Sequence, residues 1–495
     1  MARAFAGLRR SGPRSRYDAV VVGSGIGGLV AANLLAEAGR SVLLVEQHYM
    51  TGGYCSTFRR GGYTFDAATH FYPLLGNPAT LTGRLLARLG CTTQWVKMDP
   101  VDTFHFPDGS RFDVPADLES YLREVKAAFP HEATAIDRFF ATAKEAYLYG
   151  LAHFFRGLPA ERLGERLGWT LADALAAHFG DRKLRLLLAA DCAHWGSPPS
   201  RTSFVFDSML RFSYFLGNYY PVGGSQAFPD ELARCLEARG GDILMSTCCT
   251  GIVVADGRAC GVELETTRGP LAGRHRVAAD AVVCNADLRQ TIERLLPAGA
   301  VPAALAEQVR AMRLSFPCFL SHLGMRDVAP EELAAIQGYY WDDWDADRVG
   351  EDGLRCKIFA PTLYEPAMAP PGGQVVILQK VLAMDAARVD DWLAHKHEVE
   401  ERLLSHLERV LPDARRRIVT RSSATARTSE RFTWNSGGAM LGWEMSPDQL
   451  GEARPPVEGP LPGLWLVGHW TRPGGGITPV IVSATHTAER ILGEG

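Results

Sequence analysis

The feature that most constrains this chain is a glycine-rich turn between two apolar segments near its start. An apolar run over residues 19–22 leads into Gly23, Gly25 and Gly28, which have the spacing G-x-G-x-x-G. A helical pattern follows, and then a second apolar run over residues 41–45. Such glycines allow a tight turn, a close approach of backbone to a pyrophosphate and close helix–strand packing. The order predicts binding of the ADP half of a dinucleotide at the start of the helix.

An acidic residue stands where such a site needs one. Glu46 ends the second apolar run, eighteen residues after Gly28. A carboxylate at this distance can accept hydrogen bonds from a ribose hydroxyl group. An ordinary glycine turn in another α/β unit is the alternative, and the flanking strands and the acid favour the dinucleotide site.

The residues after Glu46 favour FAD over NAD. Gly52, Gly53 and Thr57 form a G-G-x-x-x-T stretch, and a second close approach of backbone suits a cofactor that extends beyond the first turn. No second dinucleotide fingerprint follows in the sequence. We therefore expect electrons to leave to a quinone or to oxygen, or the flavin to be recycled on the substrate.

Three separated segments resemble one known group of enzymes. They are residues 52–72 (GGYCSTFRRGGYTFDAATHFY), residues 221–265 and residues 463–492 (GLWLVGHWTRPGGGITPVIVSATHTAERIL). They resemble the FAD-dependent oxidoreductases that include phytoene desaturases, carotenoid cis–trans isomerases and retinol saturases. The resemblance implies a long isoprenoid or carotenoid-like polyene as substrate. Its C–C double bonds would be formed, isomerised or saturated by hydride exchange with flavin N5, and the motifs do not separate these three reactions.

Four positions depart from the pattern of this group and its relatives. Tyr54 stands where related amine oxidases usually have Arg, and Asp66 begins Asp-Ala-Ala in place of Asp-x-Gly. His469 replaces the Asp that many relatives use to hold the ribityl chain. Cys249 stands where a branched apolar residue usually supplies a backbone contact on the adenine side. These changes alter which side chains we expect to contact the flavin, but FAD remains the expected cofactor.

The predicted site residues follow from these motifs. His70 and His469 are candidates for moving a proton, and Trp470 is a candidate for covering the ring or the end of the substrate site. A hydrogen-bonded structural histidine is the alternative for His70. The glycines before residue 477 let backbone approach a ring system, and a helix starting there would favour negative charge on a reduced flavin. The residues expected to bind the cofactor are Gly23, Gly25, Gly28, Glu46, Gly52, Gly53, Thr57, Cys249, Gly468, Gly475, Gly476 and Ile477.

The sequence predicts an α/β fold with a discontinuous cofactor domain. We expect an FAD-binding Rossmann-type domain, like that of amine oxidases and phytoene desaturases, and an inserted α+β substrate domain. The cofactor domain is assigned to residues 17–72, 221–297 and 456–495, and the substrate domain to residues 73–220 and 298–455, after a basic tail over residues 1–16.

Aromatic residues are frequent in the first insertion. A tunnel lined by their rings would suit a polyene, although most such rings simply form core in proteins of this size. The aromatic residues in question are Phe139, Phe140, Tyr147, Tyr149, Phe154, Phe155, Phe204, Phe206, Phe212, Tyr214, Phe215, Tyr219 and Tyr220.

Composition excludes several classes of protein. The formal net charge is −4, so nothing indicates nucleic-acid binding. The ten cysteines include no C-x-x-C pair, so a metal site has no support and the thiols are typical of a cytoplasmic protein. No apolar run is long enough to span a membrane, which leaves peripheral contact with a membrane open.

Two other functions are compatible with the fingerprint. One is an amine-oxidase-like flavoprotein that acts on a smaller polar substrate. The other is a binding protein like the GDP-dissociation inhibitors, which use a similar fold without catalysis. The aromatic insertions and the absent Arg count against the first, and the complete PGGG turn, residues 473–476, counts against the second.

Overall fold

The first sheet carries the glycine fingerprint at its centre. The computed structural model describes residues 12–269, 271–353 and 355–493. In this part of the chain the strand order is β10-β11-β12-β1-β2-β9, with β18 pairing to β12. The pairs β12–β1, β1–β2, β2–β9 and β12–β18 are parallel. The strands are β1 (Arg16–Val22), β2 (Val42–Val45), β9 (Asp242–Leu244), β10 (Thr247–Ala255), β11 (Arg258–Thr266), β12 (Gly273–Cys284) and β18 (Leu464–Leu466).

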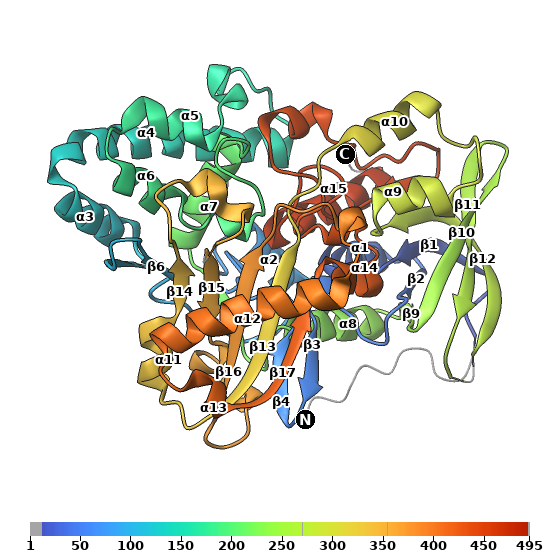
Figure 1. Ribbon diagram of the computed structural model, residues 1–495. Helices are drawn as coiled ribbons and strands as arrows, with labels where there is room; N and C mark the ends of the chain where they lie inside the picture. The colour runs from blue at the N-terminus through green and yellow to red at the C-terminus, as the bar shows by residue number, and fades with distance from the viewer. Residues whose placement is uncertain (1–11, 270, 354, 494–495) are drawn as a thin grey trace.

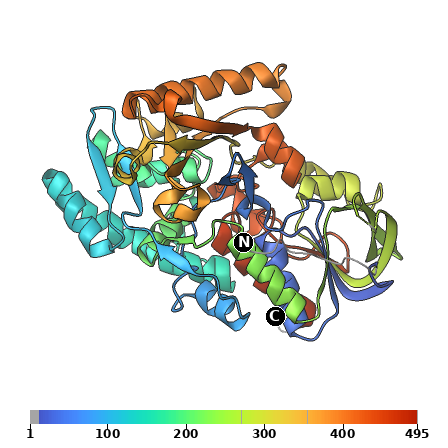
Figure 2. The same ribbon diagram turned by 90° about the horizontal axis from the view of Figure 1, so that it is seen from below.

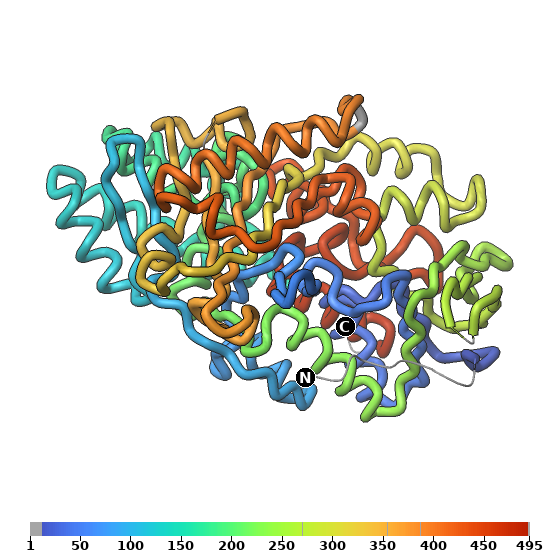
Figure 3. Tube along the Cα trace, turned by 60° about the horizontal axis from the view of Figure 1, so that its bottom comes forward, coloured from blue at the N-terminus to red at the C-terminus, as the bar shows by residue number. Residues whose placement is uncertain are grey.

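Segments far apart in the sequence build this part of the molecule. Helix α1 (Ile26–Glu37) packs between α8 (Ala227–Ala238) and α15 (Ile477–Leu492). Eleven of the residues of α1, all but Glu37, are buried, because the helix is apolar on all sides and has neighbours on all sides. The blue, green and red parts of the chain therefore lie together in Figure 3.

A second sheet combines strands from both predicted insertions. Its order is β17-β13-β16-β15-β14-β6-β7. Helix α12 (Trp392–Val410) lies along its outer side (Figure 2) and buries Leu403, Leu404 and Leu407 against Phe319 and Leu323. The strands are β6 (Asp102–His105), β7 (Arg111–Val114), β13 (Cys318–Arg326), β14 (Gly338–Tyr340), β15 (Cys356–Phe359), β16 (Gly373–Val381) and β17 (Ile418–Ala424).

A group of helices lies beside the second sheet (Figure 1). Helix α3 ends at Ala128, and α4 ends at Gly150, where a π-helical turn, Leu151–Phe155, follows. Buried rings such as Phe139, Phe179 and Phe204 form the core of this group. The helices are α3 (Leu118–Ala128), α4 (Ala133–Gly150), α5 (Leu171–His178), α6 (Arg182–Ala189) and α7 (Phe204–Phe215).

Shorter elements connect these layers. The remaining strands are β3 (Thr57–Arg60), β4 (Tyr63–Asp66), β5 (Trp95–Lys97) and β8 (Tyr219–Pro221), which pair as β3–β4 and β5–β8. The remaining helices are α2 (Leu81–Arg88), α9 (Leu288–Gln290), α10 (Ala303–Ala311), α11 (Pro330–Ile336), α13 (Ala414–Arg417) and α14 (Ala426–Thr433). No helix in the described ranges combines the length and the apolar composition that a membrane span requires.

The end of the predicted basic tail overlaps the first strand. Arg16 already belongs to β1 and pairs with Asp280, and Arg14 lies 3.4 Å from Asp242. Residues 1–11, with the other arginines of the predicted tail, lie outside the described residues. The division into cofactor and substrate domains stays a prediction.

A buried ion pair joins the two insertions within the second sheet. Asp102 on β6 accepts a hydrogen bond from Lys357 Nζ on β15 at 2.8 Å, and the two side chains are 7% and 1% exposed. The ammonium group also lies 3.7 Å from the centre of the Phe71 ring. Burial lowers the pKa of Lys357 to about 8 despite the carboxylate. Each charge is therefore tolerated only because the other is present.

We expect Asp102→Ala to destabilise the fold by about 3 kcal/mol or more, since it leaves a buried ammonium group without a counterion. The double variant Asp102→Ala/Lys357→Met should recover most of the loss. Urea unfolding followed by circular dichroism measures both. The matched control is Glu398→Ala, which breaks the exposed pair with Arg402 on α12 and should cost less than about 1 kcal/mol. If Asp102→Ala and the control lost equal amounts of unfolding free energy, this account would be contradicted.

Candidate functional site

The turn between β1 and α1 leaves the start of α1 open. Gly23 has a φ of 97°, which favours glycine. Gly25 is the N-cap of α1 and, as a glycine, has no side chain to accept a hydrogen bond from the first turn of this helix. The free N–H groups and the helix dipole can therefore bind an anionic group such as a phosphate.

The glycines also allow close packing beneath the turn. A Cβ atom on Gly28 would lie 2.1 Å from the carbonyl oxygen of Gly23. A Cβ atom on Gly27 would lie 3.2 Å from the Cα atom of Gly468, in the segment that leads to α15. The side chain of Asn285, at the end of β12, donates a hydrogen bond to the Gly23 carbonyl at 3.3 Å. Chain segments from both ends of the sequence thus meet at this turn.

Glu46 is held at the end of β2 by its own network. Its Oε2 atom accepts hydrogen bonds from the Ser24 amide and hydroxyl groups, both at 2.8 Å, and Oε1 accepts one from the His48 amide at 2.8 Å. Burial raises the pKa of Glu46, and these donors oppose that rise. Each carboxylate oxygen can still accept a further hydrogen bond, for example from the ribose hydroxyl group that the sequence predicts here.

A cavity of about 210 Å³, which we call the nucleotide cavity, opens at this turn. The predicted residues that line it come from all three parts of the predicted cofactor domain. They are Gly23, Gly25, Glu46, Gly52, Gly53, Cys249, Gly468, His469, Gly476 and Ile477.

A second cavity of about 620 Å³, which we call the apolar cavity, adjoins the first. Gly475 lines this cavity, and six residues line both cavities. The shared residues are Tyr54, Thr69, Met440, Leu441, Gly476 and Ile477. Most of the wall is apolar, and no Asp or Glu side chain among the described residues contributes to it.

The start of α15 lies where the two cavities meet. Its N-cap is Gly476, with a φ of 106° and no side-chain cap. A Cβ atom on Gly475 would lie 2.5 Å from the carbonyl oxygen of Leu441. A second uncapped helix end and a second close approach of backbone therefore face the same space as α1.

His469 lines the nucleotide cavity, whereas Trp470 lines neither cavity. Both donate to one acceptor, Asn435 Oδ1, each at 3.1 Å, through His469 Nε2 and Trp470 Nε1. This arrangement leaves His469 Nδ1 without a proton. Burial, and then the nearby Arg454, lower the pKa of His469 to about 3, so the ring is neutral. Trp470 instead packs edge-on against Trp443.

His70 lines the apolar cavity. Its Nδ1 atom donates to the Ala68 carbonyl at 3.0 Å, and its ring stacks on Phe359 with centres 4.6 Å apart. Burial, and then the charge of Lys357, lower its pKa to about 3. The ring is neutral, and its Nε2 atom has no hydrogen-bond partner among the described residues.

Several predicted residues lie away from the cavity walls. Thr57 begins β3, and its amide donates to Gln226. Gly28 packs below the turn. Of the aromatic residues named above, four line the apolar cavity, and others, such as Phe139 and Phe212, are core. The four are Tyr147, Phe155, Phe206 and Tyr214.

Asn285, Asn435, His194 and Gln379 are among the cavity residues that were not predicted as site residues from the sequence. Asn285 follows a strand, which is a usable signal in an α/β fold. Asn435, His194 and Gln379 carry no motif, because only the tertiary structure brings their segments to the cavities. Tyr54 was noted as a departure, and its hydroxyl group donates to the Ala439 carbonyl at 3.0 Å.

The arrangement fits a flavin dinucleotide. Two uncapped helix ends, two close approaches of glycine backbone and an acid at the end of β2 surround one continuous space. The residues that would hold the cofactor are those lining the nucleotide cavity and the start of α15. The apolar cavity would then place an organic substrate against the flavin at the shared residues.

Comparisons with known proteins agree with this geometry. The chain is 26% identical to prolycopene isomerase from Daucus carota, over 97% of this chain and 81% of the relative. It is 27% identical to a phytoene desaturase from Rhodobacter capsulatus, over 96% and 93% of the two chains. The solved structure of cyclohexylamine oxidase from Brevibacterium oxydans matches with a TM-score of 0.64 and 16% identity, over 97% and 99% of the two chains, and shows the shared fold.

The predicted fold class and the predicted resemblance are both confirmed by these matches. A family model described as flavin-containing amine oxidoreductase matches residues 26–492. This range includes the residues that line both cavities apart from those of the first strand and turn. The chain belongs to the family of flavin-containing amine oxidoreductases.

Proposed function

We propose that this protein is an FAD-dependent oxidoreductase that acts on C–C double bonds of an elongated apolar polyene of the carotenoid type. The observation that carries the proposal is the junction of the two cavities. An apolar cavity of about 620 Å³ meets the nucleotide cavity at Tyr54, Gly476 and Ile477. The names of the relatives, a prolycopene isomerase and a phytoene desaturase, support the same substrate class.

The bound flavin would supply hydride exchange with a carbon atom of the substrate. The apolar wall of the cavity would bind the polyene, hold the reacting carbon near the shared residues and exclude water. The start of α15 would stabilise negative charge on the side of the site that it faces.

The role of His70 and His469 in moving a proton stays a prediction, and we propose that each ring acts in the site as a neutral hydrogen-bond acceptor. His469 Nδ1 and His70 Nε2 both lack a proton in the hydrogen-bond networks described above. Because burial lowers both pKa values to about 3, near pH 7 neither ring is available as an imidazolium donor and neither takes up a proton readily. Trp470 does not touch either cavity, so we assign it a positioning role through Asn435.

The apolar wall disfavours the alternative of a small amine as substrate. A buried ammonium group is best stabilised by a carboxylate partner. No carboxylate among the described residues lines the apolar cavity. Membership in an oxidoreductase family leaves the binding-protein alternative without support. We propose a quinone or oxygen as the electron acceptor.

The flavin part is tested with Gly28→Ala. We expect this variant to lose most of its bound flavin, because the added Cβ atom meets the Gly23 carbonyl oxygen and displaces the start of α1. Absorbance of the purified protein near the flavin band, with release of the nucleotide for chromatography, identifies FAD. Gly168→Ala is the control, because no atom lies within 4 Å of its Cβ position. A colourless wild-type protein that binds no added FAD would overturn the proposal.

The substrate part is tested by expression in bacteria that make phytoene, lycopene or their cis isomers, followed by pigment chromatography. Longer conjugation identifies desaturation, changed geometry identifies isomerisation, and one lost double bond identifies saturation. If no pigment changes while the purified protein contains FAD, the carotenoid assignment is wrong and the flavin assignment stands.

We also propose that the mouth of the apolar cavity contacts a membrane surface, from which an insoluble polyene can enter. Three lining leucines are exposed at this mouth: Leu81 (60%), Leu148 (51%) and Leu216 (44%). The exposed Arg156 lies with them and suits an anionic lipid headgroup.

The triple variant Leu81→Ser/Leu148→Ser/Leu216→Ser should bind vesicles containing anionic lipid more weakly than the wild type. Removing three apolar side chains from the interface should cost roughly 3 kcal/mol of membrane affinity or more. Co-sedimentation with vesicles measures the change. Leu393→Ser is the control, since Leu393 is 80% exposed on α12 and does not line the cavity. Equal binding by all three proteins would refute the membrane contact.

A further inference from the structure

Arg454 is a fully buried cation whose hydrogen-bond acceptors are all neutral. Its side chain is 0% exposed. The guanidinium group donates to the backbone carbonyl groups of Trp443, Gln449 and His469 and to the sulfur atom of Met445. Burying a charge costs free energy unless an opposite charge accompanies it, and arginines without such a partner are rarely buried completely. A function that uses this charge would explain its place in the core.

The guanidinium group of Arg454 keeps its proton. Burial lowers its pKa to about 9, which leaves the group charged near pH 7. The acids close to it in the sequence have other surroundings: Glu444 pairs with Arg201 at 2.9 Å and with Arg313 at 3.0 Å, and Glu452 is exposed. Within the part of the chain that the structure describes, no carboxylate forms an ion pair with Arg454.

Arg454 lies behind the turn that leads into α15. Its Nη2 atom donates to the carbonyl group of His469 at 3.1 Å, and a Cβ atom on Gly474 would lie 3.5 Å from its Cζ atom. His469 lines the nucleotide cavity, and the next two glycines after Gly474 line the apolar cavity. Arg454 itself lines neither cavity. The guanidinium group therefore packs against the outer side of the turn whose inner side faces the junction of the two cavities.

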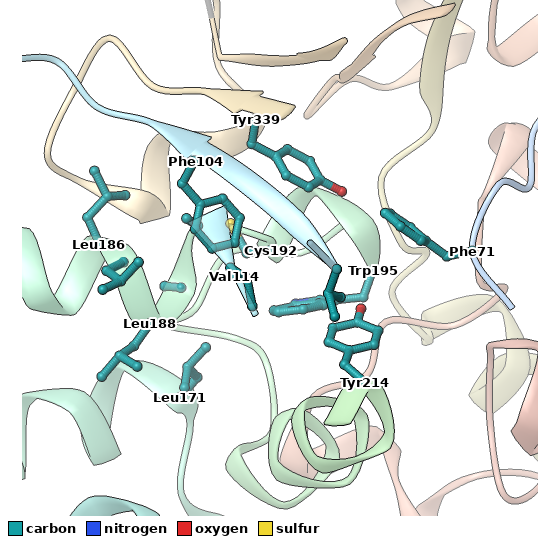
Figure 4. Close-up of a cluster of buried hydrophobic side chains, with 14 of the residues drawn as sticks. Phe71, Phe104, Val114, Leu171, Leu186, Leu188, Cys192, Trp195, Tyr214 and Tyr339 are labelled. Carbon is teal, nitrogen blue, oxygen red and sulfur yellow. The ribbon is translucent and has the colours of Figure 1, made fainter. Parts of the chain in front are cut away.

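The cavity walls near this turn do not offset the charge of Arg454. His70 and His469 are neutral, as described above. Glu46, the acid that lines the nucleotide cavity, is not among the residues shared with the apolar cavity. Trp195 and Tyr214, which line the apolar cavity, lie among other buried apolar side chains (Figure 4). In such low-polarity surroundings a charge acts over a longer distance than in water.

A reduced flavin would supply the missing negative charge. Hydride transfer adds two electrons and one proton to a flavin, so the ring gains one negative charge unless a second proton follows. The start of α15 already favours negative charge in this space. A full positive charge behind the same turn would add to that effect, because a cation near the ring stabilises the anionic reduced form more than the neutral oxidised form.

We propose that Arg454 raises the reduction potential of the bound flavin by stabilising its anionic reduced form. The inference rests on the proposed function, because it requires FAD at the junction of the cavities. Arg454 acts by its charge, through the turn before α15, and does not touch the reacting atoms. A higher potential favours transfer of hydride from the substrate to the flavin, which is the direction that desaturation requires.

Two neutral variants test the proposal. Arg454→Gln can still donate hydrogen bonds to backbone carbonyl groups, whereas Arg454→Met cannot. In both flavin-loaded proteins, titration against a reference dye should show that the equilibrium constant for two-electron reduction falls about tenfold or more, a shift of about 30 mV to lower potential. If only Arg454→Met lowers the potential, the hydrogen bonds and not the charge are responsible, and the proposal is overturned.

Arg472→Met is the matched control. Arg472 lies in the same turn, and its guanidinium group donates to the carbonyl groups of Arg454 and Glu452. Its side chain is partly exposed, so water and salt screen its charge, and the equilibrium constant should change less than about twofold. If this variant lowers the potential as much as Arg454→Gln does, a general disturbance of the turn explains the effect and the proposal fails.

The affinity for FAD separates this role from one toward the pyrophosphate. Linkage requires that a variant with a lower potential loses more affinity for reduced FAD than for oxidised FAD. Equal losses for the two forms would leave the potential unchanged, and Arg454 would then serve the phosphates or the fold alone. That result would overturn the inference while FAD binding stands.

The wild-type protein provides a measurement that does not depend on the folding of any variant. Its reduced flavin should keep the absorption spectrum of the anion down to a lower pH than free reduced FAD does. Protonation at the same pH as in free FAD would overturn the inference. A wild-type protein that binds no FAD would overturn the proposed function, and this inference with it.

Discussion

The close packing of glycine backbone between α1 and the segment before α15 is the contact on which the rest of the site depends. A Cβ atom on Gly27 would lie 3.2 Å from the Cα atom of Gly468, and one on Gly468 would lie 2.5 Å from Asn285 Oδ1, so a side chain on either glycine would disturb this packing. This approach brings the uncapped starts of α1 and α15 to one space, although they are about 450 residues apart in the chain. A larger distance between these two segments would move the start of α1 and the start of α15 away from the space that they share.

The two cavities differ in what stabilises their walls. The nucleotide cavity is built from backbone amides, glycines and one carboxylate, which suit a charged and polar cofactor. The apolar cavity is built from side chains on the second sheet and the helices beside it, which also form the largest core cluster. Because the substrate wall is part of that core, changes in substrate shape require repacking of neighbouring residues. The buried pair Asp102–Lys357 holds the sheet behind this wall together.

Burial determines the electrostatics of the site. His70 and His469 are both kept neutral because burial disfavours an imidazolium, and a nearby cation, Lys357 for His70 and Arg454 for His469, lowers each pKa further. Neutral rings with fixed tautomers act as directional hydrogen-bond acceptors, so they can orient a donor group of a ligand. The same low-polarity surroundings make His70 Nε2, which has no hydrogen-bond partner among the described residues, costly to bury unless a ligand or water satisfies it.

The sequence alone determined the cofactor half of this protein. The strand–turn–helix unit at Gly23–Gly28, the acid Glu46 and the PGGG turn before α15 are local patterns, and local backbone geometry requires glycine at their positive φ angles. It did not determine which aromatic rings line the substrate cavity, that Trp470 faces Trp443, or that His194 and Asn435 join the site. Those residues come together through packing between segments far apart in the chain, and no periodicity or spacing in one segment records which neighbour it will meet.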